Sequence, residues 1–264
     1  MKIKIYKTFL FIGIYLYANF SFGQKQTQVK YDHLVLFVKT KKLQEELTES
    51  LFTLAEKAGT AHLNQGTKGR YFFFYNTYIE LLYLSDSAKA IANQSNFGSN
   101  YIKRWETTAN SCPFAFGLNL IPFDTSLTPL SFHKYKSKDA ATDDFYLMSP
   151  YNTELNQPMI YVSTPKHAYE PYNSLDDVDL RFEDFMRVEQ KSYLSHPSGI
   201  KRLTDIKVTL AENESISGNN EFLNNLEQVQ IEKGLQHELI LIFDEQAQGK
   251  EFSFEVDFPL IIKY

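Results

Sequence analysis

Two side chains that could bind a metal or move a proton lie inside hydrophobic runs. His33 stands near the start of the run 31–38, YDHLVLFV, and Glu80 stands inside the run 78–84, YIELLYL. Burying an imidazole or a carboxylate without a polar partner is costly, so each side chain must find one in the fold. Two interpretations are open. The pair could be ligands of a divalent metal, or they could be hydrogen-bonded residues of the core and of an edge strand.

The elements around this pair follow the order β-α-β-β-β. Residues 31–38 predict a strand, and apolar residues then repeat at helical spacing behind a Thr40 cap, with Gly59 at the helix end. The repeating positions are Leu43, Leu47, Leu51, Leu54 and Ala58. A short extended piece near 61–63 and a loop at 65–69 follow. Strands are then predicted at 70–75 and 78–84, with a tight turn between them.

The C-terminal third shows the same order of elements, which indicates a duplication unless the recurrence is coincidental. Residues 203–210 alternate as a strand, and Asn220 can cap the helix that follows. That helix carries its apolar residues at Phe222, Leu223, Leu226 and Val229. Strands are predicted at 238–243 and 251–258, and Pro259 ends or interrupts the last one.

The segment 86–200 is less regular. It contains two candidate strands, at 112–120 and 158–162, and the polar residues 131–156 read as long surface loops of the kind that form lids or binding walls. The acidic stretch 176–184 is most simply a solvated face.

The N-terminus has the pattern of a secretory signal peptide. A basic stretch at 1–7 precedes an apolar run at 8–22, and Gly23 is the expected cleavage point. An uncleaved membrane anchor is the alternative. With cleavage, we expect a periplasmic or secreted protein without stable membrane insertion.

Composition narrows the class of protein further. The single cysteine, Cys112, excludes an internal disulfide, so the 22 phenylalanines and 17 tyrosines must supply much of the core. A formal net charge of −5 without a basic cluster argues against nucleic acid as a partner. The sequence leaves open whether the protein is a monomer or a homodimer.

In this order of elements the chain resembles the vicinal-oxygen-chelate superfamily and, within it, the glyoxalase-like domains. The resemblance is carried by residues 32–38, His62, 66–67 and 76–82, and more weakly by 113–118, 158–161 and 196–199. It implies an α+β fold in which two βαβββ modules form a half-open curved sheet or barrel around a cavity. Within a single domain, 24–264, the modules would span about 30–86 and 201–264, with an irregular segment at about 87–200.

The resemblance also implies a metal site. In metal-dependent members, the first and fourth strands of each module hold a divalent ion that chelates two substrate oxygens and stabilises an enediolate-like anion. His33 and Glu80 match these positions, and Asp205 stands where a histidine or glutamine is usual. Glu255 would match Glu80 as a proton-moving carboxylate, whereas an alternative register with 259–261 leaves no ligand there. The implied ion is Mn, Ni, Fe or Zn, or no metal at all.

Four further residues are candidates for substrate binding. Lys207 lies on the same face as Asp205 and could instead form a salt bridge with Asp205 or Glu255, competing with a cation. His62 and Arg70 could reach the cavity mouth, where Arg70 would suit a carboxylate or phosphate, or could lie on the surface. His196 either lines the pocket or belongs to a turn.

These residues predict an exported glyoxalase-like enzyme that acts on a small oxygenated organic molecule through metal chelation. Glu80 or Glu255 would move the proton, in an isomerase, lyase or dioxygenase reaction. The alternative is a metal-free protein that sequesters an aromatic or hydrophobic molecule in the same cavity.

Overall fold

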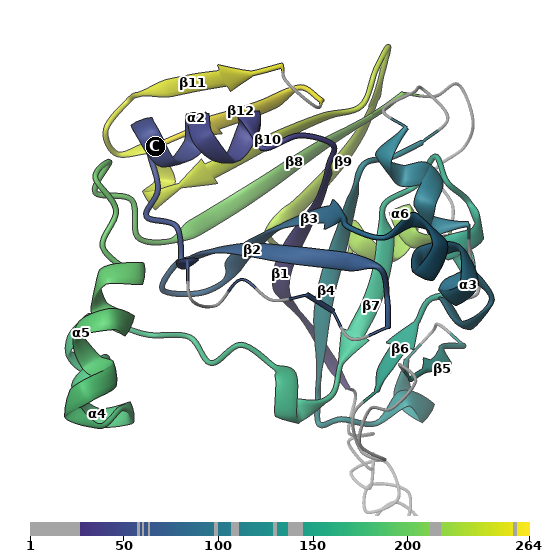
Figure 1. Ribbon diagram of the computed structural model, residues 1–264, viewed down its shortest axis with the longest axis horizontal. Helices are drawn as coiled ribbons and strands as arrows, with labels where there is room; N and C mark the ends of the chain where they lie inside the picture. The colour runs from purple at the N-terminus through teal and green to yellow at the C-terminus, as the bar shows by residue number, and fades with distance from the viewer. Residues whose placement is uncertain are drawn as a thin grey trace, which may run out of the picture.

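The computed structural model describes residues 27–56, 59, 61–62, 64–97, 100–106, 111–128, 131–136, 145–211, 218–255 and 258–264. The expected signal peptide, 1–23, lies outside these residues. The described chain has an α+β fold with two mixed sheets, neither of which closes into a barrel (Figure 1). The predicted α+β class with two sheet modules is confirmed.

The first sheet has seven strands in the order β2-β3-β1-β4-β7-β6-β5. Their bounds are β1 (Gln28–Val38), β2 (Thr67–Phe73), β3 (Tyr78–Leu84), β4 (Phe114–Ile121), β5 (His133–Tyr135), β6 (Tyr146–Met148) and β7 (Met159–Ser163). The segment predicted to be irregular therefore supplies four of the seven strands, including both strands that were expected in it.

The second sheet has five strands in the order β11-β12-β10-β8-β9 and lies entirely within the predicted second module. Its strands are β8 (Leu203–Ala211), β9 (Val229–Gly234), β10 (Glu238–Phe243), β11 (Glu251–Phe254) and β12 (Leu260–Lys263). The strand predicted at 251–258 is thus shorter than expected, and a separate strand follows Pro259.

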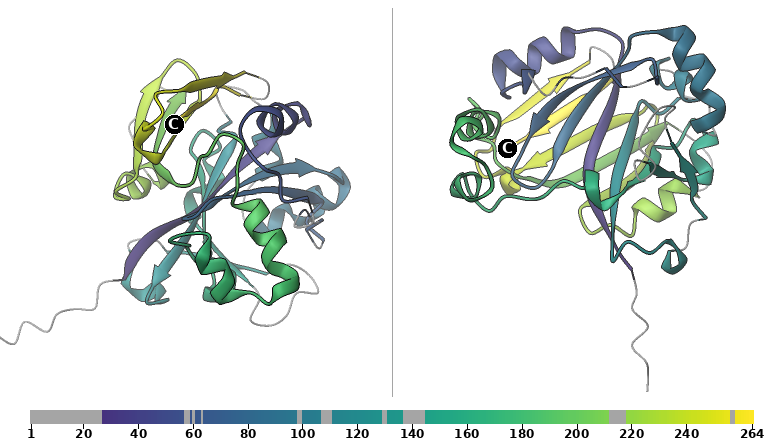
Figure 2. Two further views of the ribbon diagram at one scale, coloured as in Figure 1. Left: turned by 90° about the vertical axis from the view of Figure 1, so that its left-hand side faces the viewer. Right: turned by 60° about the horizontal axis from the view of Figure 1, so that its bottom comes forward.

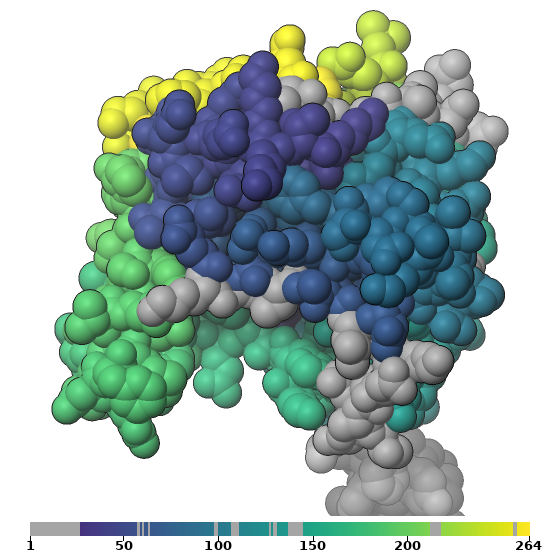
Figure 3. Space-filling view, in the orientation of Figure 1, coloured from purple at the N-terminus to yellow at the C-terminus, as the bar shows by residue number. Residues whose placement is uncertain are grey.

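The helices are short. They are α2 (Lys42–Ser50), α3 (Ser87–Phe97), α4 (Asp176–Arg181), α5 (Asp184–Tyr193) and α6 (Asn219–Leu223), with 3-10 turns η2 (Tyr101–Trp105), η3 (Thr125–Leu127), η4 (Pro150–Thr153), η5 (Pro165–His167) and η6 (Asp244–Gln246). Helix α2 ends before the predicted Ala58 because the backbone N–H groups of Thr53 and Ala55 bond to His196 and Tyr71 instead. Helices α4 and α5 form a projection at the lower left of the molecule (Figures 1 and 3). In the described part of the chain, no helix has the length and apolarity to cross a membrane.

The main core lies between the two sheets, which lie against each other in both views of Figure 2. Alternation along β1 sends Leu34, Leu36 and Val38 into this core. Residues Ile206, Val208 and Leu210 of β8 enter the same core from the second sheet. The opposite face of β1, with His33, Val35 and Phe37, is therefore turned away from the second sheet.

The two sheets repeat one pattern of strand pairing. Strand β1 pairs in parallel with β3 and antiparallel with β4, and β8 pairs in the same way with β9 and β10. Each sheet continues with a parallel pair, β4 with β7 and β10 with β12, and then with an antiparallel pair, β7 with β6 and β12 with β11. The pairing is therefore compatible with the predicted correspondence of β1 with β8, and the residue-by-residue alignment of 32–36 with 204–208 stays a prediction.

A buried arginine fastens the loops beside the first sheet. The guanidinium of Arg104 in η2 donates to the carbonyl oxygens of Cys112, Leu155, Gln157, Asn152 and Glu154, at 2.7–3.4 Å. Its side chain is completely buried, and burial lowers its pKa to about 10. Because η2 also carries Tyr101 and Trp105, these bonds hold one wall of the cavity described below.

Replacing Arg104 by leucine should destabilise the protein strongly. The substitution leaves buried carbonyl groups without donors, and each such group costs about 1–3 kcal/mol. We expect the free energy of unfolding, measured by urea denaturation, to fall by about 3 kcal/mol or more. A half-buried arginine on α5, Arg187→Leu, serves as the control and should change it by about 1 kcal/mol or less, because Arg187 bonds to only one carbonyl, that of Phe182, and to Asp184. Equal effects of the two substitutions would contradict this role of Arg104.

Candidate functional site

A cavity of about 290 Å³ opens on the face of the first sheet that is turned away from the second sheet. Eight aromatic side chains line it: Phe37, Tyr71, Tyr78, Phe97, Tyr101, Tyr135, Tyr146 and Tyr161. Its polar lining consists of His33, His62, Gln65, Thr67, Glu80, Ser163 and His167. Aromatic walls with a few converging polar groups are typical of small-molecule sites.

An irregularity in β1 creates the polar centre of this cavity. Opposite β4, the register shifts between Tyr31, which faces Leu118, and His33, which faces Gly117, so Asp32 is an extra residue. Neighbouring residues of a regular strand point to opposite faces, but a bulge re-aims a side chain. Here Asp32 Oδ1 lies 2.5 Å from Nδ1 of His33.

The carboxylate of Asp32 is almost fully buried and has several donors. Its Oδ2 accepts hydrogen bonds from Nδ2 of Asn119 at 2.5 Å and from the backbone N–H of Tyr169 at 2.7 Å. Burial alone would raise the pKa of Asp32, but the hydrogen bond and charge of His33, together with these donors, hold it below its usual value. Asp32 is therefore an ionised acceptor, and Nδ1 of His33 carries the proton between them.

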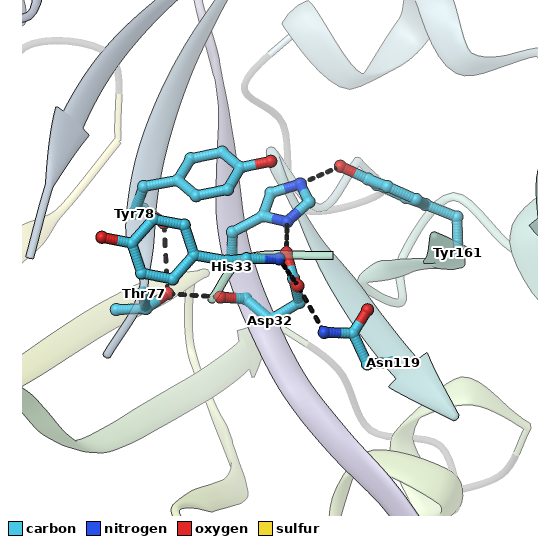
Figure 4. A network of polar contacts seen from close by, with 7 residues as sticks. Asp32, His33, Thr77, Tyr78, Asn119 and Tyr161 are labelled. Atoms are coloured by element: carbon cyan, nitrogen blue, oxygen red, sulfur yellow. Dashed lines mark hydrogen bonds and ion pairs between the residues drawn. The ribbon is translucent and has the colours of Figure 1, made fainter. Parts of the chain in front are cut away.

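In the neutral tautomer that carries its proton on Nδ1, the other nitrogen of His33 is an acceptor. Nε2 of His33 meets the hydroxyl of Tyr161 on β7, which donates to it (Figure 4). The imidazole also stacks on Tyr78 of β3, with ring centroids 4.1 Å apart and planes 12° apart. The result is a linear series of hydrogen bonds, Asp32–His33–Tyr161, that ends at a hydroxyl in the cavity.

Two glycines on neighbouring strands make room for the two polar side chains that the sequence singled out. A Cβ at Gly117 of β4 would overlap the His33 ring, and a Cβ at Gly69 of β2 would overlap the carboxylate of Glu80 and the hydroxyl of Tyr71. Any larger residue at either position would displace the polar group beside it.

Glu80 and His62 form a second polar group in the same cavity. Nε2 of His62 lies 3.3 Å from Oε1 of Glu80 and 3.2 Å from the hydroxyl of Tyr71, which itself lies 3.4 Å from that carboxylate oxygen. Nδ1 of His62 meets the Thr67 hydroxyl at 2.9 Å. Glu80 is 7 % exposed, so this carboxylate has few other sources of stabilisation.

The hydroxyls of Tyr78 and Tyr161 stay protonated. Burial raises the pKa of both well above 10, and the negative charges of Glu80 and Asp32 raise them further. Both side chains are thus neutral hydrogen-bonding groups at the polar centre of the cavity.

Of the predicted site residues, His33, Glu80 and His62 do meet in one cavity. Asp205, Lys207 and Glu255 do not line it. Asp205 and Lys207 do lie on the strand face opposite Ile206, as alternation predicts, and Ile206 belongs to the core between the two sheets. That face of β8 therefore points away from the cavity. Glu255 is exposed at the end of β11, an edge strand of the second sheet.

Arg70 and His196 also lie outside the cavity lining. The Arg70 guanidinium reaches back to the carbonyl of Glu56 at 3.4 Å. His196 is buried between Phe52 and Phe74, where Nδ1 accepts from the Thr53 N–H and Nε2 donates to the Phe73 carbonyl. Burial lowers the pKa of His196 to about 4. The neutral ring therefore joins β2 to the segment after α2, a structural role that the sequence did not suggest.

The donor set does not fit the predicted three-ligand metal site. Asp205 lies on the other sheet, and both nitrogens of His33 already face hydrogen-bonding partners. Among the described residues, no three His, Cys, Asp or Glu side chains are grouped to hold an ion. A metal bound by His33 and Glu80 alone stays a prediction, and no chemical step is assigned to it here.

The residues that the sequence did not single out are Asp32, Tyr161 and Tyr78. The Asp-His dipeptide was visible, but in a regular strand its two side chains would point apart. Tyr161 lies 128 positions from His33, and only the parallel pairing of β4 with β7 brings it near.

Comparison with known proteins adds little. No family model matches the chain, and no curated protein matches it. A solved structure described as a hypothetical protein from Staphylococcus aureus is similar over 89 % of this chain and 99 % of its own, with 11 % identity and a TM-score of 0.49. This likeness carries no information about function.

Replacing Asp32 by asparagine should destabilise the protein in a pH-dependent way. Near pH 7 we expect a loss of about 1.5–3 kcal/mol, the usual range for a hydrogen bond to a charged group. Because the pKa of Asp32 is lower in the folded state, its stabilisation is complete well above the unfolded value and is lost as the pH falls through the folded value. Urea unfolding should show the difference from wild type shrinking below about pH 4. A difference that stays constant down to acid pH would contradict this.

Replacing Gly117 by alanine should act through His33. The added methyl group overlaps the imidazole, and such overpacking typically costs about 1–3 kcal/mol. In the background of His33→Ala the ring is gone, and we expect the cost of Gly117→Ala to fall below about 0.5 kcal/mol. Urea unfolding of the double-mutant cycle measures the coupling. Equal costs in both backgrounds would show that Gly117 does not make room for His33.

Proposed function

We propose that the protein is an enzyme that moves a proton on a small oxygenated organic molecule bound in this cavity. The observation that supports it most is the series Asp32–His33–Tyr161, in which a buried carboxylate orients an imidazole whose acceptor nitrogen meets a cavity-facing hydroxyl. A base oriented by a carboxylate in this way is typical of general acid–base catalysis.

In the proposed reaction, an acidic proton of the substrate passes to the Tyr161 oxygen as the Tyr161 proton passes to Nε2 of His33. The high pKa of Tyr161 disfavours a free tyrosinate, so both transfers belong to one step. Asp32 then stabilises the imidazolium, since it lies 2.5 Å from the proton-bearing Nδ1. The proton returns to another substrate atom by the reverse path.

This chemistry favours isomerase or lyase reactions among those predicted from the sequence, because both begin by removing a proton next to a carbonyl or hydroxyl group. The mainly aromatic walls favour a substrate with an aromatic or otherwise apolar body. Export from the cytoplasm remains part of the proposal on the strength of the N-terminal sequence.

A second candidate function is sequestration of an aromatic molecule without chemistry. The eight aromatic side chains of the cavity favour it, since ring stacking alone can hold a planar ligand. In that case the Asp32–His33–Tyr161 series would serve to bind a hydroxyl or carbonyl group of the ligand.

Proton exchange separates the two candidates. In D₂O, we expect the wild-type protein to accelerate deuterium incorporation at the carbon next to the carbonyl of 2-hydroxyacetophenone. The loss of the proton NMR signal of that carbon measures the rate. Tyr161→Phe and His33→Gln should each slow this reaction by about 100-fold or more, the usual contribution of a general base. Thermal unfolding of both variants checks that they are folded.

The control is Tyr193→Phe, because the Tyr193 hydroxyl bonds to Glu189 within α5, outside the cavity. It should leave exchange unchanged. Wild-type exchange at the rate of buffer alone would contradict the enzymatic proposal, as would full activity of Tyr161→Phe.

A further inference from the structure

The charged groups of the cavity have one sign. Among the described residues that line it, none is a lysine or arginine, and Glu80 is the acid. The second carboxylate, Asp32, lies directly behind His33. The two cationic residues that the sequence suggested for substrate binding, Arg70 and Lys207, lie outside the cavity lining. A carboxylate or phosphate on the ligand would therefore enter a negative environment without a cationic partner of permanent charge.

The carboxylate of Glu80 is loosely held for a buried charge. Its two contacts, to Nε2 of His62 and to the Tyr71 hydroxyl, measure 3.3 and 3.4 Å, longer than the usual 2.7–3.2 Å. A buried carboxylate of this kind is stabilised when a cation or a better donor reaches it. His62, which is only half-buried, is a contact of Glu80 that could give way to such a ligand.

Aromatic rings surround this carboxylate. Tyr71 of β2 pairs directly with Glu80 across the strands, and Tyr78 precedes Glu80 by two positions on the same face of β3. The two rings meet nearly edge to face, with centroids 5.9 Å apart. A carboxylate among tyrosine rings is a favourable site for an ammonium group, because the cation can interact with the carboxylate and with a ring.

We propose that the cavity selects a small aromatic amine in its ammonium form. Glu80 binds the ammonium group beside Tyr71 and Tyr78, the aromatic walls hold the ring, and an oxygen of the ligand reaches Tyr161 and His33. The inference rests on the proposed function only in taking this cavity as the ligand site, and it does not require any proton transfer to occur.

Three probes of one shape and different charge test this inference. The first is tyramine, a cation. The second is tyrosol, its neutral analogue, which has a hydroxyl in place of the ammonium group. The third is 4-hydroxyphenylacetate, an anion. Trp105 is the single tryptophan of the chain, and its ring lies 4.8 Å from that of Phe37, while its Nε1 donates to the Leu82 carbonyl. Because Phe37 and Leu82 line the cavity, tryptophan fluorescence reports on binding, and calorimetry confirms it.

We expect tyramine to bind the wild-type protein at least about tenfold more tightly than tyrosol, and 4-hydroxyphenylacetate to bind most weakly. Glu80→Gln should reduce the preference for tyramine to about twofold or less. Glu227→Gln removes the same charge from an exposed position of the second sheet region and should leave the preference unchanged. Thermal unfolding checks that both variants are folded, and the wild-type comparison stands without them.

Several results would overturn the inference. They are equal or tighter binding of tyrosol, a preference for the anion, an undiminished preference in Glu80→Gln, and no binding of any probe to the wild type. Each leaves the proposed proton transfer standing, because that is read from deuterium exchange on an uncharged ketone. Conversely, absent exchange with a clear preference for tyramine would remove the enzymatic proposal and retain the aromatic amine as ligand.

Discussion

The structure around the cavity depends on the bulge that turns Asp32 toward His33. A carboxylate this deeply buried must be surrounded by donors, and Asp32 meets them from three directions: His33 of its own strand, Asn119 of β4 and the backbone of Tyr169. Its backbone carbonyl also accepts from Thr77 in the turn before β3. One residue thus connects the centre of the first sheet with the segment after β7, and it fixes the orientation of the imidazole at the same time. The need of the buried Asp32 carboxylate for hydrogen-bond donors therefore determines both how these segments pack and how the site is oriented.

The first sheet serves two surfaces because its strands alternate. One set of side chains, such as Leu34 and Leu36, packs on the second sheet, and the other set, such as His33 and Val35, lines the cavity. The second sheet therefore supports the site from behind without contributing to the cavity lining described here. This division explains why substitutions in the second sheet are expected to affect stability, whereas substitutions at His33, Glu80 or Tyr161 are expected to affect ligands. It also explains why glycine stands at positions 69 and 117. A Cβ atom at Gly117 would overlap the His33 ring of the neighbouring strand, and one at Gly69 would overlap the carboxylate of Glu80.

The two carboxylates, Asp32 and Glu80, determine the electrostatics of the cavity. Burial, reinforced by the carboxylates of Asp32 and Glu80, keeps Tyr78 and Tyr161 protonated, so the hydroxyls act as neutral donors and acceptors and not as anions. The same charges oppose an anionic ligand and favour a cationic one. Proton transfer and charge selection would then use two groups of residues in one cavity, with His33 and Tyr161 in one group and Glu80, Tyr71 and His62 in the other.

The sequence by itself determined most of the local secondary structure and which residues of a regular strand point to the same face. The hydrophobic runs 31–38 and 78–84 correctly marked β1 and β3, and the β-branched and aromatic runs correctly marked most other strands. Tertiary structure decided which strands became neighbours and what each face covered. That is why Asp205 and Lys207 lie outside the cavity lining and why 87–200 completes the first sheet. The alternation of side chains along a strand depends only on neighbouring residues, so it can be predicted from the sequence. The bulge at Asp32 and the approach of Tyr161 depend on pairing between distant strands, whose energy comes from contacts that only the folded chain makes.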